Sequence, residues 1–136
     1  MSASNFLQPI TFGDCDPAGI VFYPNYFAWF DRTFHDWLRP YGGHAAIVTR
    51  MGAIGIGIMQ VNARFHSPAS DGDELNLSLS VEKWGGKTLH LNYEGRVGSR
   101  LVVSGNETRG LFMRGENGMF AAEMDGLRKV LDPNDS

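Results

Sequence analysis

The chain has 136 residues, of which 43% are hydrophobic and 20% charged, and its formal net charge is −3 at pH 7. This composition is typical of a globular protein that can bury a core, so we expect one domain over residues 1–136. The negative charge argues against a nucleic-acid partner. No apolar run approaches the roughly 20 residues of a membrane span, and the start "MSASNFLQPI" lacks signal-peptide features. We therefore expect a cytoplasmic protein with no membrane partner.

The first elements are a short strand, a turn and a long helix. "FLQPITF" can form a strand whose Pro9 suits an edge position, and the acidic, glycine-containing turn "GDCDPAG" follows it. Pro24 suits a first helical turn, and Pro40 with "YGGH" stops the helix. Aromatic and apolar residues at three- and four-residue steps give this helix a strongly apolar face. They are Phe27, Phe30, Phe34, Trp37 and Leu38, widened by Tyr26 and Trp29.

The rest of the chain has the two-residue period of strands. After a short helical turn in "AAIVTR", the segments "DELNLSLSVEKW", "KTLHLNYEGRV" and "LVVSGNETRGLFM" alternate and are separated by turns at Gly85-Gly86 and "VGSR". The tail "MFAAEMDGLRKVL" is part strand and part helix. One apolar helix followed by an antiparallel meander predicts an α+β fold, with the helix packed against a curved sheet.

Several possible chemical motifs are weak. "GAIGIGIMQ" lacks the third glycine of a nucleotide-binding loop, so we interpret its glycines as marking a strand that another group approaches closely. Cys15 has no neighbouring His or Lys to activate it, and we interpret it as a small packed residue. Asp31 and His35 lie one helical turn apart, a spacing that could hold a metal, but no third ligand is near in sequence. We expect neither a metal nor a cofactor.

Asp16 is the main candidate for chemistry. Aspartate is common in turns and near helix starts, where it caps N–H groups, so a structural role is one interpretation. Its surroundings favour another, because Gly19 permits a tight bend and the residues after it are apolar. A helix that begins after Tyr23 presents unpaired N–H groups to the same space. A carboxylate beside such donors suits acyl transfer: the donors stabilise the oxyanion while the carboxylate attacks or activates water.

Two segments resemble a known family. "FGDCDPAGIVFYPNY" resembles the signature of the 4-hydroxybenzoyl-CoA thioesterase family of the hotdog-fold superfamily, and "NARFHSPASDGDELNLSLSVEKWGGKT" resembles its strand region. The resemblance implies a long central helix wrapped by a five- or six-stranded antiparallel sheet. It also implies hydrolysis of an acyl-CoA thioester without metal or cofactor, by homo-oligomers, often tetramers, with active sites between subunits.

The resemblance also assigns residues. The family's catalytic aspartate falls on Asp16, and the N–H that polarises the thioester carbonyl falls on Tyr23. Asp31 matches a carboxylate that meets a ring hydroxyl in the aromatic-acyl branch, although a solvated helix residue is an equal alternative. Pro24 stands where several short-chain thioesterases have histidine, which favours the aromatic branch. We place Gly19, Pro24 and Asp31 in the substrate-binding region.

The phosphate-binding stretch departs from the family pattern. The family's Trp-Arg-Arg-Lys is replaced by Trp84-Gly85-Gly86-Lys87, so Lys87 is its one retained cation. Basic residues later in the chain, such as Arg100, Arg109 and Arg128, are either strand-edge charges or substitute phosphate contacts. The predicted function is therefore an acyl-CoA thioesterase, preferably for an aromatic acyl group. The alternatives are a thioesterase for aliphatic acyl-CoA or acyl carrier protein, and a non-catalytic module that binds acyl thioesters.

Overall fold

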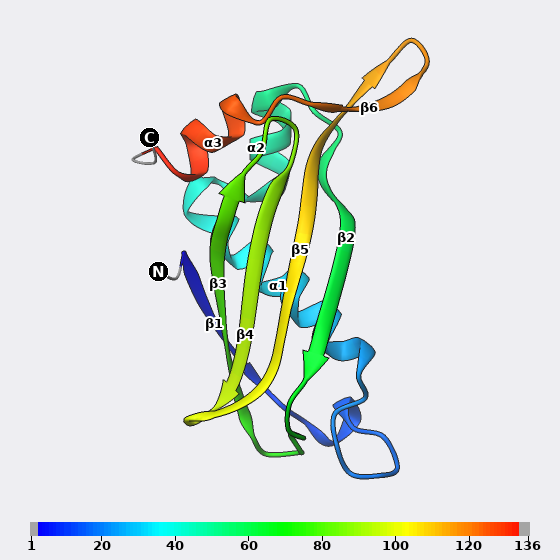
Figure 1. The fold of residues 1–136 in the computed structure, drawn as a ribbon, viewed down its shortest axis with the longest axis vertical. Helices are drawn as coiled ribbons and strands as arrows, with labels where there is room; N and C mark the ends of the chain where they lie inside the picture. Colours follow the sequence, from blue (N-terminus) through cyan, green and yellow to red (C-terminus); the bar gives the residue numbers. More distant parts are fainter. Residues whose placement is uncertain (1–2, 134–136) are drawn as a thin grey trace.

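The computed structural model describes residues 3–133, so the first two and last three residues of the predicted domain lie outside the described range. These residues form a six-stranded antiparallel sheet and a long helix that crosses it (Figure 1). The elements in chain order are β1 (Ser4–Pro9), the short 3-10 helix η1 (Phe12–Asp14), α1 (Pro24–Leu38), the 3-10 helix η2 (Arg39–Tyr41), α2 (Gly43–Met51), β2 (Gly55–Phe65), β3 (Glu74–Trp84), β4 (Leu89–Val97), β5 (Arg100–Gly115), β6 (Gly118–Ala122) and α3 (Asp125–Leu131).

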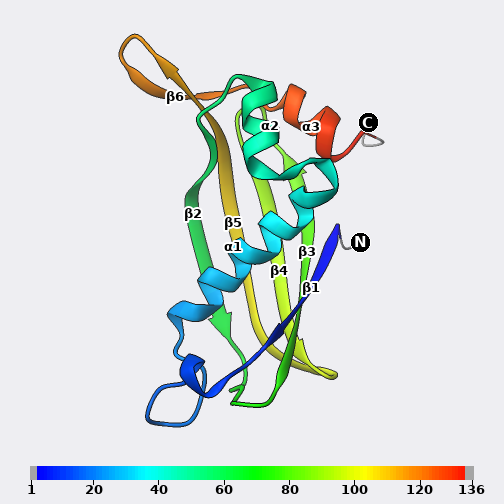
Figure 2. The same cartoon turned by 180° about the vertical axis from the view of Figure 1, so that it is seen from behind.

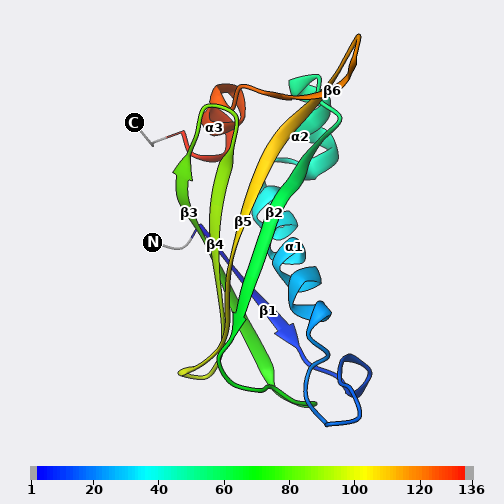
Figure 3. The ribbon, with the colours of Figure 1, turned by 45° about the vertical axis from the view of Figure 1, so that its right-hand side comes forward.

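The strand order is β1-β3-β4-β5-β2, and β6 pairs with the far end of β5. The predicted meander β3-β4-β5 occupies the middle of the sheet, while β1 and β2 form its two edges. Seen from behind and from the side, α1 runs diagonally across one face of the sheet and leaves the other face uncovered (Figures 2 and 3). This arrangement confirms the predicted α+β hotdog fold.

The helix α1 forms where the aromatic spacing predicts it. It begins at Pro24 and ends just before the turn that contains Pro40. Phe30 and Phe34 are fully buried, and the Phe30 ring stacks on Tyr93 of β4 with 4.6 Å between the ring centroids. The aromatic face of the helix therefore packs directly on the sheet. Within residues 3–133, no helix is both long enough and apolar enough to cross a membrane.

The alternation in β3 also appears as predicted. Leu75, Leu77 and Leu79 are fully buried beneath the helix, whereas Ser78 and Ser80 lie on the opposite face. Because side chains alternate between faces, one strand supplies both the core and a polar outer surface.

Two details extend the predictions. The expected helical turn in "AAIVTR" is a full helix, α2, because Ile47 and Val48 bury one side of it against the core. In β2, a Cβ atom on Gly57 would lie 2.9 Å from the ring of Phe112. The close approach that the alternating glycines predicted is therefore made by an aromatic ring of the neighbouring strand β5.

Candidate active site

The acidic turn between β1 and α1 is a closed loop. Cys15 and Val21 form an antiparallel bridge, and the amide of Asp16 donates to the carbonyl of Ile20 at 3.0 Å. Val21 also donates to the carbonyl of Ala69 at 2.9 Å, which ties the loop to the segment before β3. Cys15 is partly buried against the core, as its interpretation as a packed residue predicted. The loop thus holds its side chains on a hydrogen-bonded backbone.

Gly19 closes the tip of this loop. Its amide donates to the carbonyl of Asp16 at 2.8 Å, and its φ is +82°, a conformation that side-chain-bearing residues rarely adopt. No atom lies within 4 Å of where its Cβ would be. Glycine is therefore needed here for the bend rather than for space.

The two carboxylates of the loop have different environments. Asp14 Oδ2 accepts from both the amide (2.9 Å) and the hydroxyl (3.0 Å) of Thr11. Asp16 Oδ1 accepts from the amide of Ala18 at 2.9 Å. Within the described part of the chain, Asp16 Oδ2 has no hydrogen-bond partner. Asp14 is therefore committed to the loop, whereas Asp16 combines a structural contact with one free oxygen.

The entrance to α1 leaves one backbone donor available. Pro24 has no N–H, the amide of Asn25 donates to the carbonyl of Phe22 at 3.0 Å, and that of Tyr26 donates to Tyr23 at 3.1 Å. The amide of Tyr23 has no acceptor among residues 3–133. The expected cluster of donors is thus reduced to one N–H, and it belongs to the residue that the resemblance selected.

An apolar groove of about 350 Å³ lies beside this entrance. Burial raises the pKa of Tyr26, on its wall, to about 12, so this hydroxyl stays protonated at neutral pH. The groove is lined by Ile20, Val21, Tyr23, Tyr26, Phe65, His66, Ser67 and Pro68. It can accept an apolar or extended ligand next to the Tyr23 amide.

A larger cavity of about 620 Å³ lies between α1, the start of β2 and β5. Most of its wall is apolar, formed by isoleucines of β2 together with Phe112 and Met119. Its polar groups are Asp31, His35, His44 and Arg109. Apolar walls with a few polar groups are typical of sites for small organic ligands.

The polar groups of this cavity are held by a buried arginine. Arg109 Nη2 donates to Asp31 Oδ1 at 2.9 Å and its Nε donates to Glu107 Oε1 at 2.8 Å, while the hydroxyl of Tyr93 donates to the same oxygen at 2.7 Å. The guanidinium carbon lies 3.7 Å from the centroid of the Phe34 ring. Burial opposes the charge of Arg109, but Glu107 outweighs it and raises the pKa of the arginine. Interpreting Arg109 as a strand-edge charge or phosphate contact was wrong, because its side chain is only 2% exposed.

Asp31 is the end of this network that reaches the cavity. Its side chain is 45% exposed, yet it pairs with Arg109 and its Oδ2 lies 3.6 Å from His35 Nε2. Asp31 is therefore a carboxylate that lines the cavity and is also partly exposed to solvent, and its role toward a ring hydroxyl stays a prediction. Within residues 3–133, no group of three or more His, Cys, Asp or Glu side chains could hold a metal ion.

Lys87 lies far from the acidic loop within one chain. It is exposed in the turn that joins β3 to β4. Figure 1 shows this turn at one end of the sheet and the loop that follows β1 at the other. Arg100, a possible substitute for the phosphate contacts, donates to the hydroxyl of Ser67 (2.9 Å) and the carbonyl of Pro68 (2.5 Å). Its guanidinium is thus already engaged with the segment that lines the groove.

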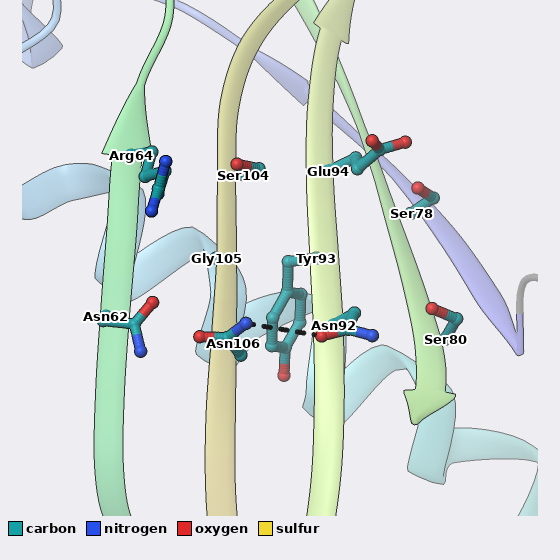
Figure 4. Close-up of a pocket in the computed structure, with 10 residues that line it drawn as sticks. All are labelled: Asn62, Arg64, Ser78, Ser80, Asn92, Tyr93, Glu94, Ser104, Gly105 and Asn106. Atoms are coloured by element: carbon teal, nitrogen blue, oxygen red, sulfur yellow. Dashed lines mark hydrogen bonds between the residues drawn. The ribbon is translucent and has the colours of Figure 1, made fainter. Parts of the chain in front are cut away.

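A polar cavity of about 520 Å³ lies on the face of the sheet that α1 leaves uncovered (Figure 4). Small uncharged side chains dominate it, and the amides of Asn106 and Asn92 face each other at 3.5 Å. Arg64 and Glu94 lie at its edge in the same view. Neither Asp16 nor Tyr23 lines it, so we do not place the chemistry there.

Sequence reasoning missed the buried pair Glu107 and Arg109, and it gave His44 no role. One signal for the pair was present. Glu107 and Arg109 fall on the same alternation as Val103 and Leu111 in "LVVSGNETRGLFM", so the period of that strand directs them toward the core.

Comparison with known proteins establishes the family. A sequence profile of the thioesterase superfamily matches residues 18–104. The 4-hydroxybenzoyl-CoA thioesterase of Pseudomonas sp. (strain CBS-3) is 38% identical over 79 residues, which cover 57% of this chain and 56% of that protein. The chain belongs to the thioesterase superfamily, as predicted, although the aligned sequence spans only about half the length of this curated relative.

Solved structures agree over most of the chain. The crystal structure of 4-hydroxybenzoyl-CoA thioesterase from Pseudomonas sp. strain CBS-3 superposes with a TM-score of 0.82 and 30% identity, covering 93% of this chain and 96% of the other. An aspartate-to-asparagine mutant of 4-hydroxybenzoyl-CoA thioesterase, solved with 4-hydroxybenzoyl-CoA, matches equally well. A gentisyl-coenzyme A thioesterase matches with a TM-score of 0.76 and 26% identity, covering 96% and 99% of the two chains.

Proposed function

We propose that this protein is a cytoplasmic thioesterase that hydrolyses an acyl-CoA, preferably one with a hydroxylated aromatic acyl group, to the free acid and CoA. The observation that carries the proposal is that, seven residues apart between β1 and α1, one carboxylate oxygen of Asp16 and the helix-entrance amide of Tyr23 have no hydrogen-bond partner within residues 3–133. Membership of the thioesterase superfamily supports it.

The chemistry assigns one role to each group. The amide of Tyr23 donates to the thioester carbonyl oxygen and stabilises the negative charge that develops there. In one route, Asp16 attacks the carbonyl carbon, expels CoA thiolate and forms an anhydride that water then cleaves. In the other route, Asp16 removes a proton from a water molecule while that water attacks the carbonyl carbon. Both routes consume one water and yield the acid and the thiol.

The larger cavity supports an aromatic substrate. Its apolar walls fit a ring, and Asp31 supplies a fixed hydrogen-bond acceptor. Two relatives are named for hydroxybenzoyl-type CoA esters, 4-hydroxybenzoyl-CoA and gentisyl-CoA. Asp31 would then accept a hydrogen bond from a ring hydroxyl.

The distances favour a site shared by two chains. Tyr23 and Asp31 are eight residues apart, which corresponds to about 12 Å along a helix and is longer than a benzoyl group. The edge strand β2 has the cavity at its start and the groove at its end. Antiparallel pairing of two β2 strands would place the cavity of one subunit beside the Tyr23 amide of the next. Such pairing would also cover the exposed side chains of Ile58, Met59 and Phe65.

The same assembly would account for Lys87. The β3–β4 turn that carries Lys87 and the loop that follows β1 lie at opposite ends of the sheet (Figure 1), which favours a contact of Lys87 with the CoA phosphates of a substrate bound at another subunit's loop. We therefore propose a homo-oligomer, a dimer at least and a tetramer by preference. Light scattering at micromolar concentration should give at least twice the mass of one chain, and a monomer that retains full activity would exclude the shared site.

A release assay for free CoA tests the function. We expect 4-hydroxybenzoyl-CoA and benzoyl-CoA to be hydrolysed with a higher kcat/KM than hexanoyl-CoA. Faster hydrolysis of hexanoyl-CoA would favour the aliphatic alternative. No release from any of the three, together with measurable binding, would favour a non-catalytic acyl-thioester-binding module.

A further inference from the structure

His44, at the start of α2, is held in one tautomer. The amide of Ile56, in β2, donates a hydrogen bond to His44 Nε2 at 3.1 Å. A ring nitrogen that accepts a hydrogen bond carries no proton, so in the neutral imidazole the proton lies on Nδ1. Burial, followed by the nearby His35 and Arg109, lowers the pKa of His44. At neutral pH the ring is therefore neutral, with an N–H at Nδ1.

This Nδ1–H is an available donor. It has no acceptor among residues 3–133, and His44 lines the larger cavity. Its ring packs edge-on against His35, with 5.3 Å between the centroids. His35 in turn lies 3.6 Å from the carboxylate of Asp31. The donor and the acceptor thus belong to one polar cluster on the cavity wall.

Asp31 is suited to accept rather than to donate. One of its oxygens is taken by Arg109, and the other forms no hydrogen bond within the described residues. Arg109 is itself fixed by Glu107 and by the carbonyl of Ile56, so Asp31 is held by a group that cannot move away. Since Asp31, Glu107 and Arg109 together carry one excess negative charge, the cavity favours a neutral donor over an anionic ring substituent.

We propose that His44 is a specificity-determining residue whose Nδ1–H donates to a ring hydroxyl of the bound acyl group, while Asp31 accepts a hydrogen bond from a ring hydroxyl. A hydroxyl both donates and accepts, so a hydroxylated ring satisfies both side chains. An aryl amine satisfies Asp31 but is a poor acceptor for His44, and an unsubstituted ring satisfies neither. The role rests on the proposed function, because it assumes that the cavity holds the acyl group.

Non-hydrolysable ligands test the role apart from catalysis. In phenacyl-CoA, a methylene between carbonyl and sulfur makes the thioester a ketone. We would measure the Kd of phenacyl-, 4-aminophenacyl-, 4-hydroxyphenacyl- and 3,4-dihydroxyphenacyl-CoA by titration calorimetry. We expect at least one hydroxylated ligand to bind the wild type about three- to tenfold more tightly than the amino ligand, the size of one neutral hydrogen bond. No such preference would overturn the role.

Two variants separate specificity from structure. His44→Phe should abolish the preference, so that the Kd values of the amino and hydroxylated ligands become about equal. His44→Gln should retain it, because its amide oxygen can accept from Ile56 and its NH₂ can donate to the ligand. If His44→Phe raises the Kd of all four ligands by the same factor, His44 has only a structural role and the proposal is overturned.

A third measurement does not depend on a folded variant. In ¹⁵N-histidine-labelled wild type, the His44 ring should show the Nδ1–H tautomer, and that signal should shift with a hydroxylated ligand but not with phenacyl-CoA. A proton on Nε2, or no ligand-specific shift, would overturn the role. Hydrolysis of benzoyl-CoA is assayed separately. Absence of hydrolysis would contradict the proposed thioesterase function, whereas the binding measurements alone decide the role of His44.

Discussion

Arg109 on β5 donates to Asp31 on α1 at 2.9 Å, across 78 positions of sequence. The Arg109 guanidinium is buried in the core, whereas the Asp31 carboxylate is partly exposed in the wall of the larger cavity. The contact therefore connects the core to the cavity. Its partner Glu107 is also buried, and Glu107 Oε2 has no hydrogen bond. A charge network of this kind is sensitive to the loss of any one member.

Arg109→Met should destabilise the protein by about 3–5 kcal/mol, because it leaves Glu107 as a buried and uncompensated charge. Chemical denaturation at fixed protein concentration would measure the loss. The matched control is Arg109→Met with Glu107→Gln, which removes both charges and should be less destabilised than the single variant. A single-variant cost below about 1 kcal/mol would show that the carboxylate is already neutral or solvated.

Asp16→Asn should lower kcat for the best acyl-CoA by at least about 100-fold and leave the fold intact, since its amide oxygen can still accept from Ala18. The matched control is Asp14→Asn, which affects a carboxylate bound by Thr11 and should reduce kcat less. Steady-state kinetics would give kcat for both variants, and circular dichroism would check that both are folded. The reverse ranking would mean that the catalytic role belongs to Asp14.

Lys87→Ala should raise KM for acyl-CoA several-fold with kcat nearly unchanged, because the phosphates are remote from the thioester and their binding is uniform. The effect should shrink at high salt, since the side chain is exposed. An acyl-pantetheine, which lacks the nucleotide, is the control and should be insensitive. An equal change in KM for both substrates would indicate that Lys87 is structural. No change in KM for either substrate would indicate that another cation binds the phosphates.

Wild-type stability should fall relative to His44→Gln as the pH drops below about 6.5. The pKa of His44 is lowered from 6.5 in the folded protein, so the unfolded chain takes up this proton more readily than the folded chain does. The stabilisation is complete above pH 6.5 and is lost as the pH falls toward the folded-state pKa. Burial lowers this pKa most, His35 and Arg109 lower it further, and Asp31 raises it. If the free energies of unfolding of the wild type and His44→Gln change by the same amount between pH 7.5 and pH 5, the assignment is contradicted.

Local pattern accounts for most of the fold and for the acidic loop. The spacing of Phe30 and Phe34 predicted α1, and the alternation of Leu75, Leu77 and Leu79 predicted β3, because periodicity reports which side of an element is buried. It also led to Asp16, whose neighbours in sequence form its loop.

The larger cavity was not predicted, since its polar wall is assembled by tertiary packing. Asp31, His44 and Arg109 come from α1, α2 and β5, and nothing in their separations along the chain indicates that they meet. Their distances depend on how the helices sit on the sheet. The resemblance assigned Asp31 to a ring-hydroxyl position and helical spacing placed His35 beside it, but neither indicated His44 or Arg109.

The strand order has a consequence for the kinetics of folding. β3, β4 and β5 are joined by short turns. By contrast, β1 can pair with β3 only when the intervening residues 10–73 are closed into a loop. Closing that segment costs about 2.5 kcal/mol more chain entropy than closing the β3–β4 turn. We expect the central strands to pair first and β1 to dock late, with pulsed hydrogen exchange protecting β4 amides before those of β1. The loop that carries Asp16 follows β1 directly, so the catalytic carboxylate would be among the last groups to reach its position.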